Sequence, residues 1–430
     1  MARDLLFSSS VMTNSELSQS VMERIEALAQ ISEESGRLTR TFGSPAMRQA
    51  NDLVAGWMKA AGMSVSEDAI GNLIARYPAA SEHAKTFILG SHLDTVRGAG
   101  KFDGSLGVLV ALACVEQLHA EKKRLPFGID LVAFAEGEGL RFNCANLGSR
   151  ALAGSFDEQN LQLRDANGVT MADAIKSIGG DPGKISAARR DPQEILGYAE
   201  VHIEQGPVLE KKFQPVGIVT AIAGRTRAQV KFTGQCGHAG TTPMPFRRDA
   251  LAAAAEFILA VEGCTKHYPG LVATVCQIEA RPSGASLIPC EVTLSLDVRH
   301  QVDGARAVAG EHLQETAAEI AMKRGVEFDW ENQQELQSIP CSRELSDVLA
   351  KAARAHIVSA TELPSGAGHD AAAMSQITPS AMLFVRCRGG ISHHPDESVQ
   401  PGDVEIAVGI MNDFLRLLAN QQNPMLKKRS

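Results

Sequence analysis

Short apolar runs that alternate with helical patterns are the sequence feature that most constrains the fold. Residues 86–93 and 128–135 are apolar runs of strand length, and residues 106–118 between them have a helical pattern. Apolar residues also recur at helical spacing over 46–62 and stop at Gly62. Strands that alternate with helices predict an α/β fold, in which a mixed and mainly parallel sheet carries helices on both faces.

A different pattern begins near residue 216. Four runs there are typical of strands, at 216–221, 227–232, 271–278 and 292–298. Two helical patterns accompany them, at 248–261 and 306–324. These segments predict a smaller α+β domain that is inserted into the first domain.

The chain then becomes polar around 329–337, and a helical pattern at 346–357 leads to an apolar run at 381–385. We interpret this as a return to the first domain. At 430 residues the chain exceeds the ~250–300 residues at which a single hydrophobic core stops growing. We therefore predict a first domain formed by 1–214 and 331–430, and an inserted domain at 215–330.

The composition excludes several classes of protein. Hydrophobic residues at 44% and charged residues at 21% are near the averages of globular proteins, which argues against a disordered or fibrous chain. The net charge is −8, and no basic stripe occurs before residues 427–429, so nucleic acid is not an expected partner. No apolar run approaches the ~20 residues of a membrane span. Without a secretion-signal core or a C-x-x-C pair among the eight cysteines, we expect a cytoplasmic protein with reduced thiols.

Polar residues with metal-binding chemistry follow the first apolar run. His92 ends that run, and Asp103 comes shortly after it in a glycine-rich turn. Imidazole and carboxylate groups are both common ligands of divalent metals. Asp94 lies two residues beyond His92, so in an extended segment it shares a face with His92 and suits a supporting role. Taken alone, His92 and Asp103 could equally well be polar residues with only a structural role.

The next acidic cluster, Glu136 and Glu138, follows the apolar run at 128–135. Ligands of open α/β sheets bind beyond the carboxyl ends of the strands, where both acidic residues and His92 fall. Carboxylates are costly to bury without a partner, so a nearby cation would explain them, although a solvated loop is the simpler alternative. His202 and His393 also lie beside apolar runs. A lone histidine is more often structural, but the whole set favours a metal site.

Five motifs in order resemble the M20 peptidase-like superfamily, specifically its branch of allantoate amidohydrolases, N-carbamoyl-L-amino-acid hydrolases and β-ureidopropionases. They are GSHLDT at 90–95, HIEQGPVLE at 202–210, GHAGTTPM at 237–244, SGAGHDA at 365–371 and GISH at 390–393. The similarity extends from about residue 20 to residue 415. It implies an α/β catalytic domain with an inserted lid and dimerisation domain.

The resemblance also implies a dinuclear metal centre. His92, Asp103 and His202 would hold one metal, and Asp103, Glu138 and His393 the other, with Asp103 as the bridge. Two metals ~3.5–4 Å apart can share a hydroxide and polarise a carbonyl group. Zinc suits this imidazole-rich set, and manganese, cobalt or nickel can occupy the same kind of site.

For the substrate, the resemblance implies that Gln205 and Gly366 contact it and that Arg299 grips its carboxylate. A guanidinium group matches a carboxylate with two parallel hydrogen bonds, although Arg299 could also be a surface residue of a strand. His238 resembles the histidine that reaches across a homodimer and stabilises the negative charge developing on the carbonyl oxygen. The alternative for His238 is a turn residue.

Two positions depart from the family pattern. The family usually has adjacent glutamates before Gly-x-Arg-Phe, a general base and then a metal ligand, but here the base position is Gly137. Glu136 lies one residue earlier and would point to the opposite face of an extended segment, so it could serve as the base only if the loop is remodelled. Ser286 stands where the family usually has an asparagine that helps to hold the substrate.

The leading hypothesis is a metal-dependent amidohydrolase that cleaves a carbamoyl or ureido C–N bond of a small carboxylate, either an N-carbamoyl-L-amino acid or allantoate. One alternative is an M20-type dipeptidase or aminoacylase. Another is a metal-binding homologue with impaired turnover, because Gly137 lacks a carboxylate.

Overall fold

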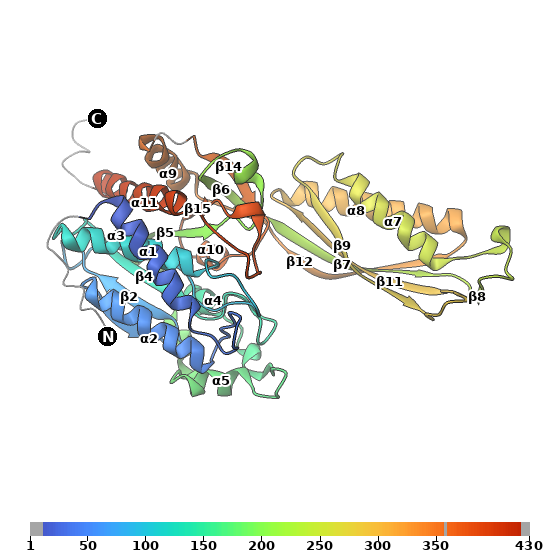
Figure 1. The fold of residues 1–430 in the computed structure, drawn as a ribbon, viewed down its shortest axis with the longest axis horizontal. Coiled ribbons are helices and arrows are strands. Elements are labelled where there is room, and N and C mark those ends of the chain that lie inside the picture. Colours follow the sequence, from blue (N-terminus) through green and yellow to red (C-terminus); the bar gives the residue numbers. More distant parts are fainter. Residues whose placement is uncertain (1–11, 357–358, 423–430) are drawn as a thin grey trace. The chain divides into compact units, whose positions relative to one another are not determined.

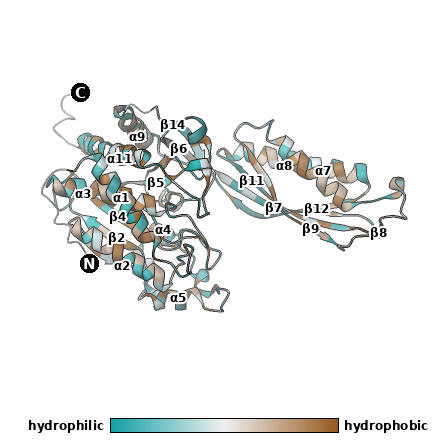
Figure 2. Ribbon diagram, viewed as in Figure 1, coloured by the Kyte–Doolittle hydropathy of each residue, from teal (hydrophilic) through white to brown (hydrophobic). Residues whose placement is uncertain are grey.

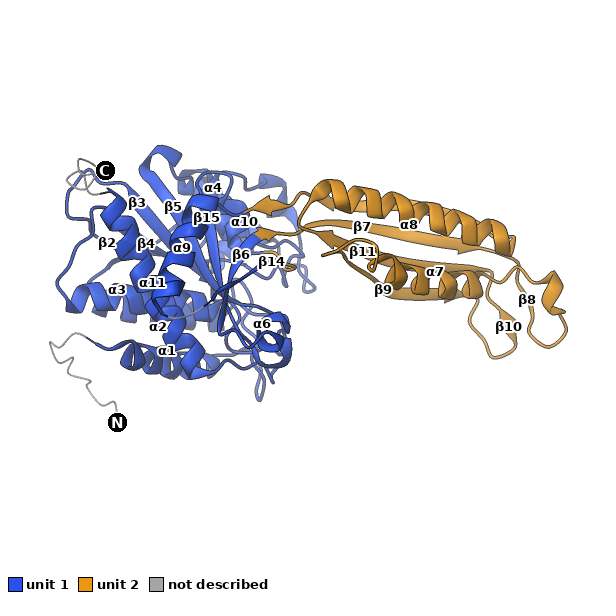
Figure 3. Cartoon of the chain, turned by 90° about the horizontal axis from the view of Figure 1, so that it is seen from above, with its two compact units in different colours: residues 1–220, 341–363, 369–430 blue, residues 221–340, 364–368 orange. Residues whose placement is uncertain are grey.

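The computed structural model describes residues 12–356 and 359–422. These divide into two units (Figure 3). Unit 2 comprises Ala221–Pro340 and Pro364–Gly368, and unit 1 comprises the other described residues. Compared with the inserted domain predicted at 215–330, unit 2 therefore begins six residues later and its main segment ends ten residues later. Strand β6 (Val216–Ile222) pairs with the sheet of unit 1, whereas the polar strand β12 (Glu327–Leu336) belongs to unit 2.

The larger sheet has nine strands in the order β1-β2-β4-β3-β5-β15-β6-β13, with β14 paired to β6. It lies in unit 1 except for β13 and the last two residues of β6 and of β14, which fall within unit 2. The remaining strands are β1 (Ser64–Glu67), β2 (Leu73–Tyr77), β3 (Thr86–His92), β4 (Gly128–Phe134), β5 (Ile195–Ile203), β13 (Ile339–Pro340), β14 (Thr361–Ser365) and β15 (Ser380–Val385). The central strands β4, β3, β5 and β15 are parallel, and β2 and β6 join them antiparallel. Every residue of β3, β4 and β15 is buried, because both faces of these central strands are covered.

Helices cover both faces of this sheet, as the sequence predicted (Figure 1). One core contains residues of α1 (Asn14–Ala29), α2 (Pro45–Ala60), α3 (Ser105–Ala120), α9 (Arg343–Ala355) and α11 (Pro401–Gln422). The other face carries α4 (Leu147–Ala153), α5 (Met171–Ser177) and α10 (Asp370–Met374), and a short helix α6 (Val208–Lys211) follows β5. The 3₁₀ turns are η1 (Glu158–Gln162), η2 (Pro182–Ala188), η3 (Pro192–Glu194), η4 (Met244–Phe246) and η5 (Arg388–Gly390).

Unit 2 contains a four-stranded antiparallel sheet in the order β12-β7-β11-β9. Its other strands are β7 (Gly224–Thr233), β9 (Val272–Arg281) and β11 (Glu291–His300). Helices α7 (Ala250–Cys264) and α8 (Asp303–Arg324) cover one face, onto which alternate residues such as Val230 and Leu294 point. The opposite face carries the polar residues of the same strands.

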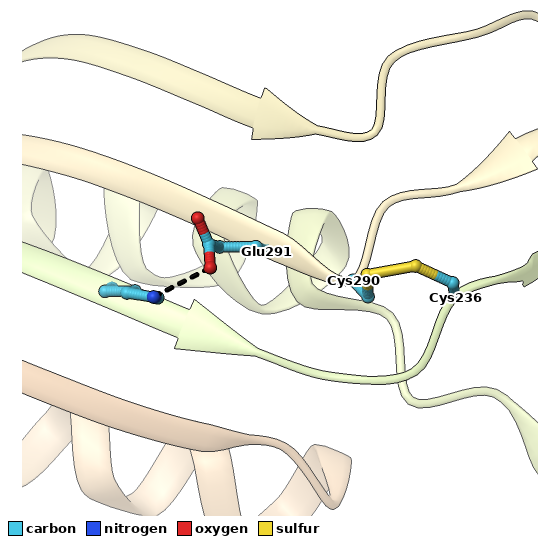
Figure 4. The surroundings of a disulfide bond; sticks show 4 residues. Cys236, Cys290 and Glu291 are labelled. Atoms are coloured by element: carbon cyan, nitrogen blue, oxygen red, sulfur yellow. Dashed lines mark ion pairs between the residues drawn. A yellow bond between two sulfur atoms is a disulfide. The ribbon is translucent and has the colours of Figure 1, made fainter.

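A small two-stranded sheet, β8 (Gly237–His238) with β10 (Leu287–Ile288), lies beyond the ends of β7 and β11 (Figure 3). A disulfide bond between Cys236 and Cys290 joins the two segments that lead to it (Figure 4). The expectation that all thiols are reduced is therefore wrong for this pair. The two cysteines are 54 residues apart in the sequence, and the antiparallel pairings of β7 with β11 and of β8 with β10 bring them together.

Among the described residues, no helix is both long enough and apolar enough to cross a lipid bilayer. Hydrophilic and hydrophobic residues both occur along α1 and α2 (Figure 2), which is typical of helices with one buried face.

Candidate active site

His92 is the last residue of β3 and is buried. Its Nδ1 lies 3.1 Å from the backbone oxygen of Asp94 and 3.5 Å from Asp94 Oδ1. A proton on Nδ1 satisfies these oxygens and leaves the Nε2 lone pair free. The Asp94 carboxylate also accepts the backbone N–H groups of Gly137 and Glu138, at 2.8 and 3.0 Å. Asp94 therefore ties the end of β3 to the loop that carries Glu138, which suits the supporting role expected of it.

Asp103 lies in the turn that leads into α3 and is 3% exposed. The turn approaches His92 closely, because a Cβ added to Gly104, where φ is +65°, would lie 2.5 Å from the His92 ring. Glycine at position 104 avoids both the strain of a positive φ and this collision. The two carboxylate oxygens of Asp103 point to different histidines: Oδ1 lies 3.1 Å from His202 Nε2, and Oδ2 lies 3.0 Å from His393 Nε2.

His202 and His393 reach Asp103 from the ends of two neighbouring strands. His202 lies near the end of β5, and its Nδ1 lies 3.0 Å from the backbone oxygen of Ile203. His393 follows β15, the parallel neighbour of β5, and has a φ of +56°. Its Nε2 also lies 3.5 Å from Glu138 Oε1. The parallel pairing of β3, β5 and β15 thus gathers the histidines at one edge of the sheet.

The five predicted metal ligands form two groups in which the ligand atoms all lie within 4.8 Å of one another: His92, Asp103 and His202, and Asp103, Glu138 and His393. Asp103 is common to both groups. Their chemistry fits a cation. If the His202 proton is on Nδ1, the Nε2 lone pair faces Asp103 Oδ1, a buried oxygen without a hydrogen-bond partner. Two facing lone pairs repel unless a positive charge lies between them.

Burial and the close charges of this cluster shift the pKa values of its members. Burial and the charge of Asp103 together raise the pKa of Glu138 to about 7. Hydrogen bonding to Asp103 raises the pKa of His393 to about 9, although burial opposes the shift. Burial also acts to raise the pKa of Asp103, but the nearby rings of His202 and His393 outweigh it, and the pKa lies well below its usual range. Buried carboxylates that repel each other and attract protons are a suitable environment for divalent metals.

The sequence did not single out Glu397, which is 2% exposed. Its Oε1 accepts the backbone N–H groups of Phe102 and Asp103, at 2.8 and 3.1 Å. Its Oε2 accepts the hydroxyl of Ser392 at 3.1 Å. Glu397 therefore connects the backbone of Asp103 to the residue before His393. No periodicity marks such a residue, because its two backbone partners lie 295 and 294 positions away in the sequence.

Glu200 was also missed, although a signal for it exists. It lies two residues before His202 in β5, so strand alternation places both on one face. Its buried carboxylate accepts the hydroxyl groups of Ser91 and Tyr198 at 3.2 and 3.0 Å and the N–H of Ala371 at 2.9 Å. Burial raises its pKa to about 7. With His202 and His369 it forms a third group of possible ligand atoms, which shares His202 with the first group.

The loop that contains Glu136 and Gly137, where the sequence departs from the family pattern, has an unusual backbone conformation. Glu136 has a φ of +52° and is 1% exposed. Its Oε1 accepts the N–H of Arg141 at 3.2 Å, whereas its buried Oε2 has no hydrogen-bond partner. It belongs to none of the possible ligand groups found among the described residues. Burial raises its pKa well above the usual range, and the charge of Asp94 adds to the effect.

Gly137 passes directly against His92. A Cβ added at this position would lie 2.5 to 2.8 Å from three atoms of the His92 side chain. The present loop therefore has no room for any side chain at the position where the family carries its base. Neither Gly137 nor the present conformer of Glu136 presents a carboxylate beside the predicted ligands.

Gln205 lies beside these ligands in unit 1. Its Nε2 donates to Asp103 Oδ2 and to Ser392 Oγ, each at 3.1 Å, and lies 3.3 Å from His393 Nε2. It has a φ of +56°. A side-chain amide at this position can contact a substrate bound to the metal centre.

The other predicted substrate residues lie in unit 2, at opposite ends of its sheet. Arg299 is near the end of β11, where it donates to Asp297 at 2.7 and 3.0 Å and to the backbone oxygen of Gly366 at 2.6 Å. His238 is exposed in β8, opposite Leu287 in the neighbouring strand. The backbone oxygen of Ser286 accepts the N–H of Ala239 at 2.9 Å, so Ser286 lies at the His238 end.

An α/β domain with imidazole and carboxylate ligands at its strand ends, together with an inserted α+β unit, is typical of a metal-dependent hydrolase. The model of peptidase family M20/M25/M40 matches residues 88–417. The chain is 40% identical over 434 residues to allantoate deiminase 1 of Glycine max, with 94% of this chain and 90% of that protein covered. It is 37% identical to the N-carbamoyl-L-amino acid amidohydrolase of Geobacillus stearothermophilus, with 90% and 95% covered.

A solved structure supports the same relationship. The crystal structure of a hydantoinase/carbamoylase family amidase from Burkholderia multivorans superimposes with a TM-score of 0.87 at 30% identity, and 93% of this chain and 97% of that chain are covered. The chain belongs to peptidase family M20/M25/M40, and the resemblance found in its motifs is confirmed. The two relatives described above are named as an allantoate deiminase and an N-carbamoyl-L-amino acid amidohydrolase.

Proposed function

We propose that this protein is a metal-dependent amidohydrolase that cleaves the C–N bond of a carbamoyl or ureido group in a small carboxylate-bearing substrate, an N-carbamoyl-L-amino acid or allantoate. The observation that carries the proposal is the convergence of His92, Asp103, Glu138, His202 and His393 at the strand ends of unit 1. The names of the relatives give the substrate class.

Two divalent metal ions per subunit fit this set, because its two groups of ligands share Asp103. Zinc suits the imidazole nitrogens, and manganese, cobalt or nickel suit the mixed oxygen and nitrogen ligands as well. Such ions would lower the pKa of a bound water and polarise the scissile carbonyl group. Asp94 would keep the His92 ring in the tautomer whose Nε2 is free, and Glu397 would hold the Asp103 backbone in place.

The substrate carboxylate would bind to Arg299 and to the backbone at Gly366, and Gln205 would contact the substrate near the ligands. A guanidinium group has five N–H donors, and Arg299 uses three of its nitrogens on Asp297 and Gly366. One N–H on each terminal nitrogen is left for a ligand. Asp297 therefore orients Arg299 without consuming all of its donors.

The positions of His238 and Arg299 within unit 2 support the proposal of a homodimer. They lie at opposite ends of β7 and β11, and the ten residues of β11 alone span roughly 30 Å at ~3.4 Å per residue. One small substrate cannot contact both residues of the same chain. If both serve one reaction, a second copy must supply His238, which would stabilise the charge on the carbonyl oxygen. Ser286 would come from the same copy as His238.

Slow turnover is a second candidate, because the structure has a specific feature that favours it. Position 137 has no side chain and no space for one, and Glu136 is turned toward Arg141. The loss of a general base typically costs 10²–10⁴-fold in rate. Such a chain would bind metal and substrate but form product slowly.

We also propose the cytoplasmic location that the sequence led us to expect, which fractionation of cells would test.

The deciding experiment is a hydrolysis screen of the protein with added zinc, manganese, cobalt or nickel. The substrates are N-carbamoyl-L-amino acids, allantoate and β-ureidopropionate, with dipeptides and N-acyl amino acids as the comparison set. We expect turnover of one or more ureido compounds and little of the comparison set. Turnover of dipeptides or N-acyl amino acids alone would contradict the proposal. Bound metal with negligible turnover of every compound would favour the slow homologue.

A further inference from the structure

The uncovered face of the unit 2 sheet is mostly polar, although Val272 and Leu336 are exposed on it opposite Arg299 and Arg225, and its charges are unevenly distributed. At the end of β11 near Gly366, this face carries three arginines and one carboxylate: Arg225, Arg227, Arg299 and Asp297. At the other end, the same face carries two cations and four carboxylates. The cations are Lys231 and Arg281, and the carboxylates are Glu279, Glu291, Glu327 and Asp329. The two ends therefore have formal charges of about +2 and −2. A surface that contacts only solvent does not need its positive and negative charges separated in this way.

Arg225 and Arg299 are direct cross-strand partners of β7 and β11. Directly opposite like charges destabilise an antiparallel pair. Asp297 does not balance both, because its two oxygens accept Arg299 at 2.7 and 3.0 Å and Arg227 at 3.2 Å. The hydrogen bond found for the Arg225 guanidinium is to a neutral amide, Gln334, at 2.7 Å.

The Arg225 guanidinium is also only partly solvated. Its Nε is buried and has no hydrogen-bond partner. Burial lowers the pKa of Arg225, and the charges of Arg227 and Arg299 lower it further. A half-buried cation beside two like charges is unfavourable unless an anion approaches it. Arg225 therefore has unused donors and an unbalanced charge beside the residue expected to bind the substrate carboxylate.

The backbone next to this cluster leaves space for a ligand. Arg299 Nη1 donates to the oxygen of Gly366, so the segment Pro364–Gly368 lies beside the cluster. A Cβ added at Gly366 or at Gly368 would meet no atom within 4 Å. The guanidinium groups and this open backbone together offer more room and more positive charge than one carboxylate requires.

We propose that Arg225 is a specificity-determining residue that recognises a second anionic group on the substrate, next to the carboxylate held by Arg299. The inference rests on the proposed function and narrows it to ureido acids with two carboxylates, such as an N-carbamoyl derivative of an acidic amino acid. Lys231 lies on the same strand and the same face as Arg225 but already has an anionic partner. Its ammonium group pairs with Glu291 at 2.7 Å and needs no further anion (Figure 4).

The kinetic test compares N-carbamoyl-L-aspartate with N-carbamoyl-L-asparagine, which has the same shape and one carboxylate fewer. We expect the parent to prefer the aspartate derivative in kcat/KM. Arg225→Gln should reduce this preference about tenfold, the usual effect of removing one hydrogen bond to a charged group. Arg225→Lys should restore part of the preference, since it restores the charge. Lys231→Gln, on the same face of β7, should leave the preference unchanged. An equal preference in the parent and in Arg225→Gln would overturn the proposal.

A binding test separates this inference from the proposed activity. Succinate and its monoamide, neither of which has a ureido group, are titrated into the metal-loaded parent and into Arg225→Gln, and the dissociation constants are compared by NMR. If no ureido compound is hydrolysed but Arg225→Gln weakens succinate binding about tenfold more than monoamide binding, the anion site stands and the activity fails. If succinate binds both proteins equally, the inference fails whatever the activity is.

Discussion

Glu397 Oε1 lies 3.1 Å from the backbone nitrogen of Asp103 and accepts its N–H, although the two residues are 294 positions apart. The same oxygen accepts the N–H of Phe102, and a Cβ added at Gly100 would lie 2.2 to 2.3 Å from atoms of Glu397. The carboxylate is therefore enclosed by the turn that it organises. Because Asp103 is the shared member of both candidate ligand groups, this contact affects the whole centre.

Glu397→Ala should lower the affinity for metal, because the Asp103 turn and Ser392 lose a common partner. Partners of this kind typically contribute 10–100-fold in metal affinity. The measurement is a metal titration against a competing chelator. Asp396→Ala, at the exposed neighbouring position, is the matched control. Equal affinities for all three proteins would show that Glu397 has only a structural role.

Asp103→Ala should remove both metal ions together, since one oxygen of Asp103 faces each group of ligands. His393→Ala should affect mainly one of them, because His393 belongs to a single group of the two that contain Asp103. Elemental analysis of each purified variant gives the metal content per chain. Full occupancy of Asp103→Ala would contradict the assignment of this residue as the bridge.

Glu136→Gln should retain a kcat within a few-fold of the parent. Burial raises the pKa of Glu136 well above its usual range, which disfavours its carboxylate form, and a glutamine preserves its shape and its hydrogen bond from Arg141. A working general base would behave differently, with a loss of about 10²–10⁴-fold. Steady-state rates on the best substrate of the screen decide between these outcomes. A loss of that size would show that the loop rearranges and brings Glu136 to the substrate.

A substitution at position 137 tests the close contact of this loop with His92. Gly137→Ala should weaken metal binding, because the added Cβ collides with the side chain of His92. For the same reason, replacing Gly137 with glutamate is not a simple repair of the missing base. Metal affinity, measured as for Glu397, is the primary readout. An unchanged affinity would mean that the loop adapts at little cost.

His238→Ala and Arg299→Ala should each be nearly inactive alone, yet a mixture should recover activity after subunits exchange. In a mixed dimer, the chain with His238→Ala keeps its own Arg299 and receives His238 from the other chain. Random exchange gives about one quarter of the parental activity, because half of the dimers carry one complete site of two. Each variant taken alone through the same exchange is the control. No recovery in verified mixed dimers would refute the shared site.

The sequence by itself determined the local features. Apolar runs such as 128–135 predicted buried strands correctly, because a strand covered on both faces must be apolar throughout. The metal-binding residue types were visible for a related reason: histidine and glutamate directly after an apolar run are unusual unless they have a function. The motifs were sufficient to identify the family, which the comparisons confirm.

Only the tertiary structure decided which distant residues meet. The Cys236–Cys290 disulfide, the contact of Glu397 with Asp103 and the pairing of Arg225 with Arg299 all depend on strand register or chain reversal, which no local pattern encodes. The space at position 137 is another case. The sequence showed that a carboxylate is missing there, but the close approach of the backbone to His92 depends on the packing of two loops.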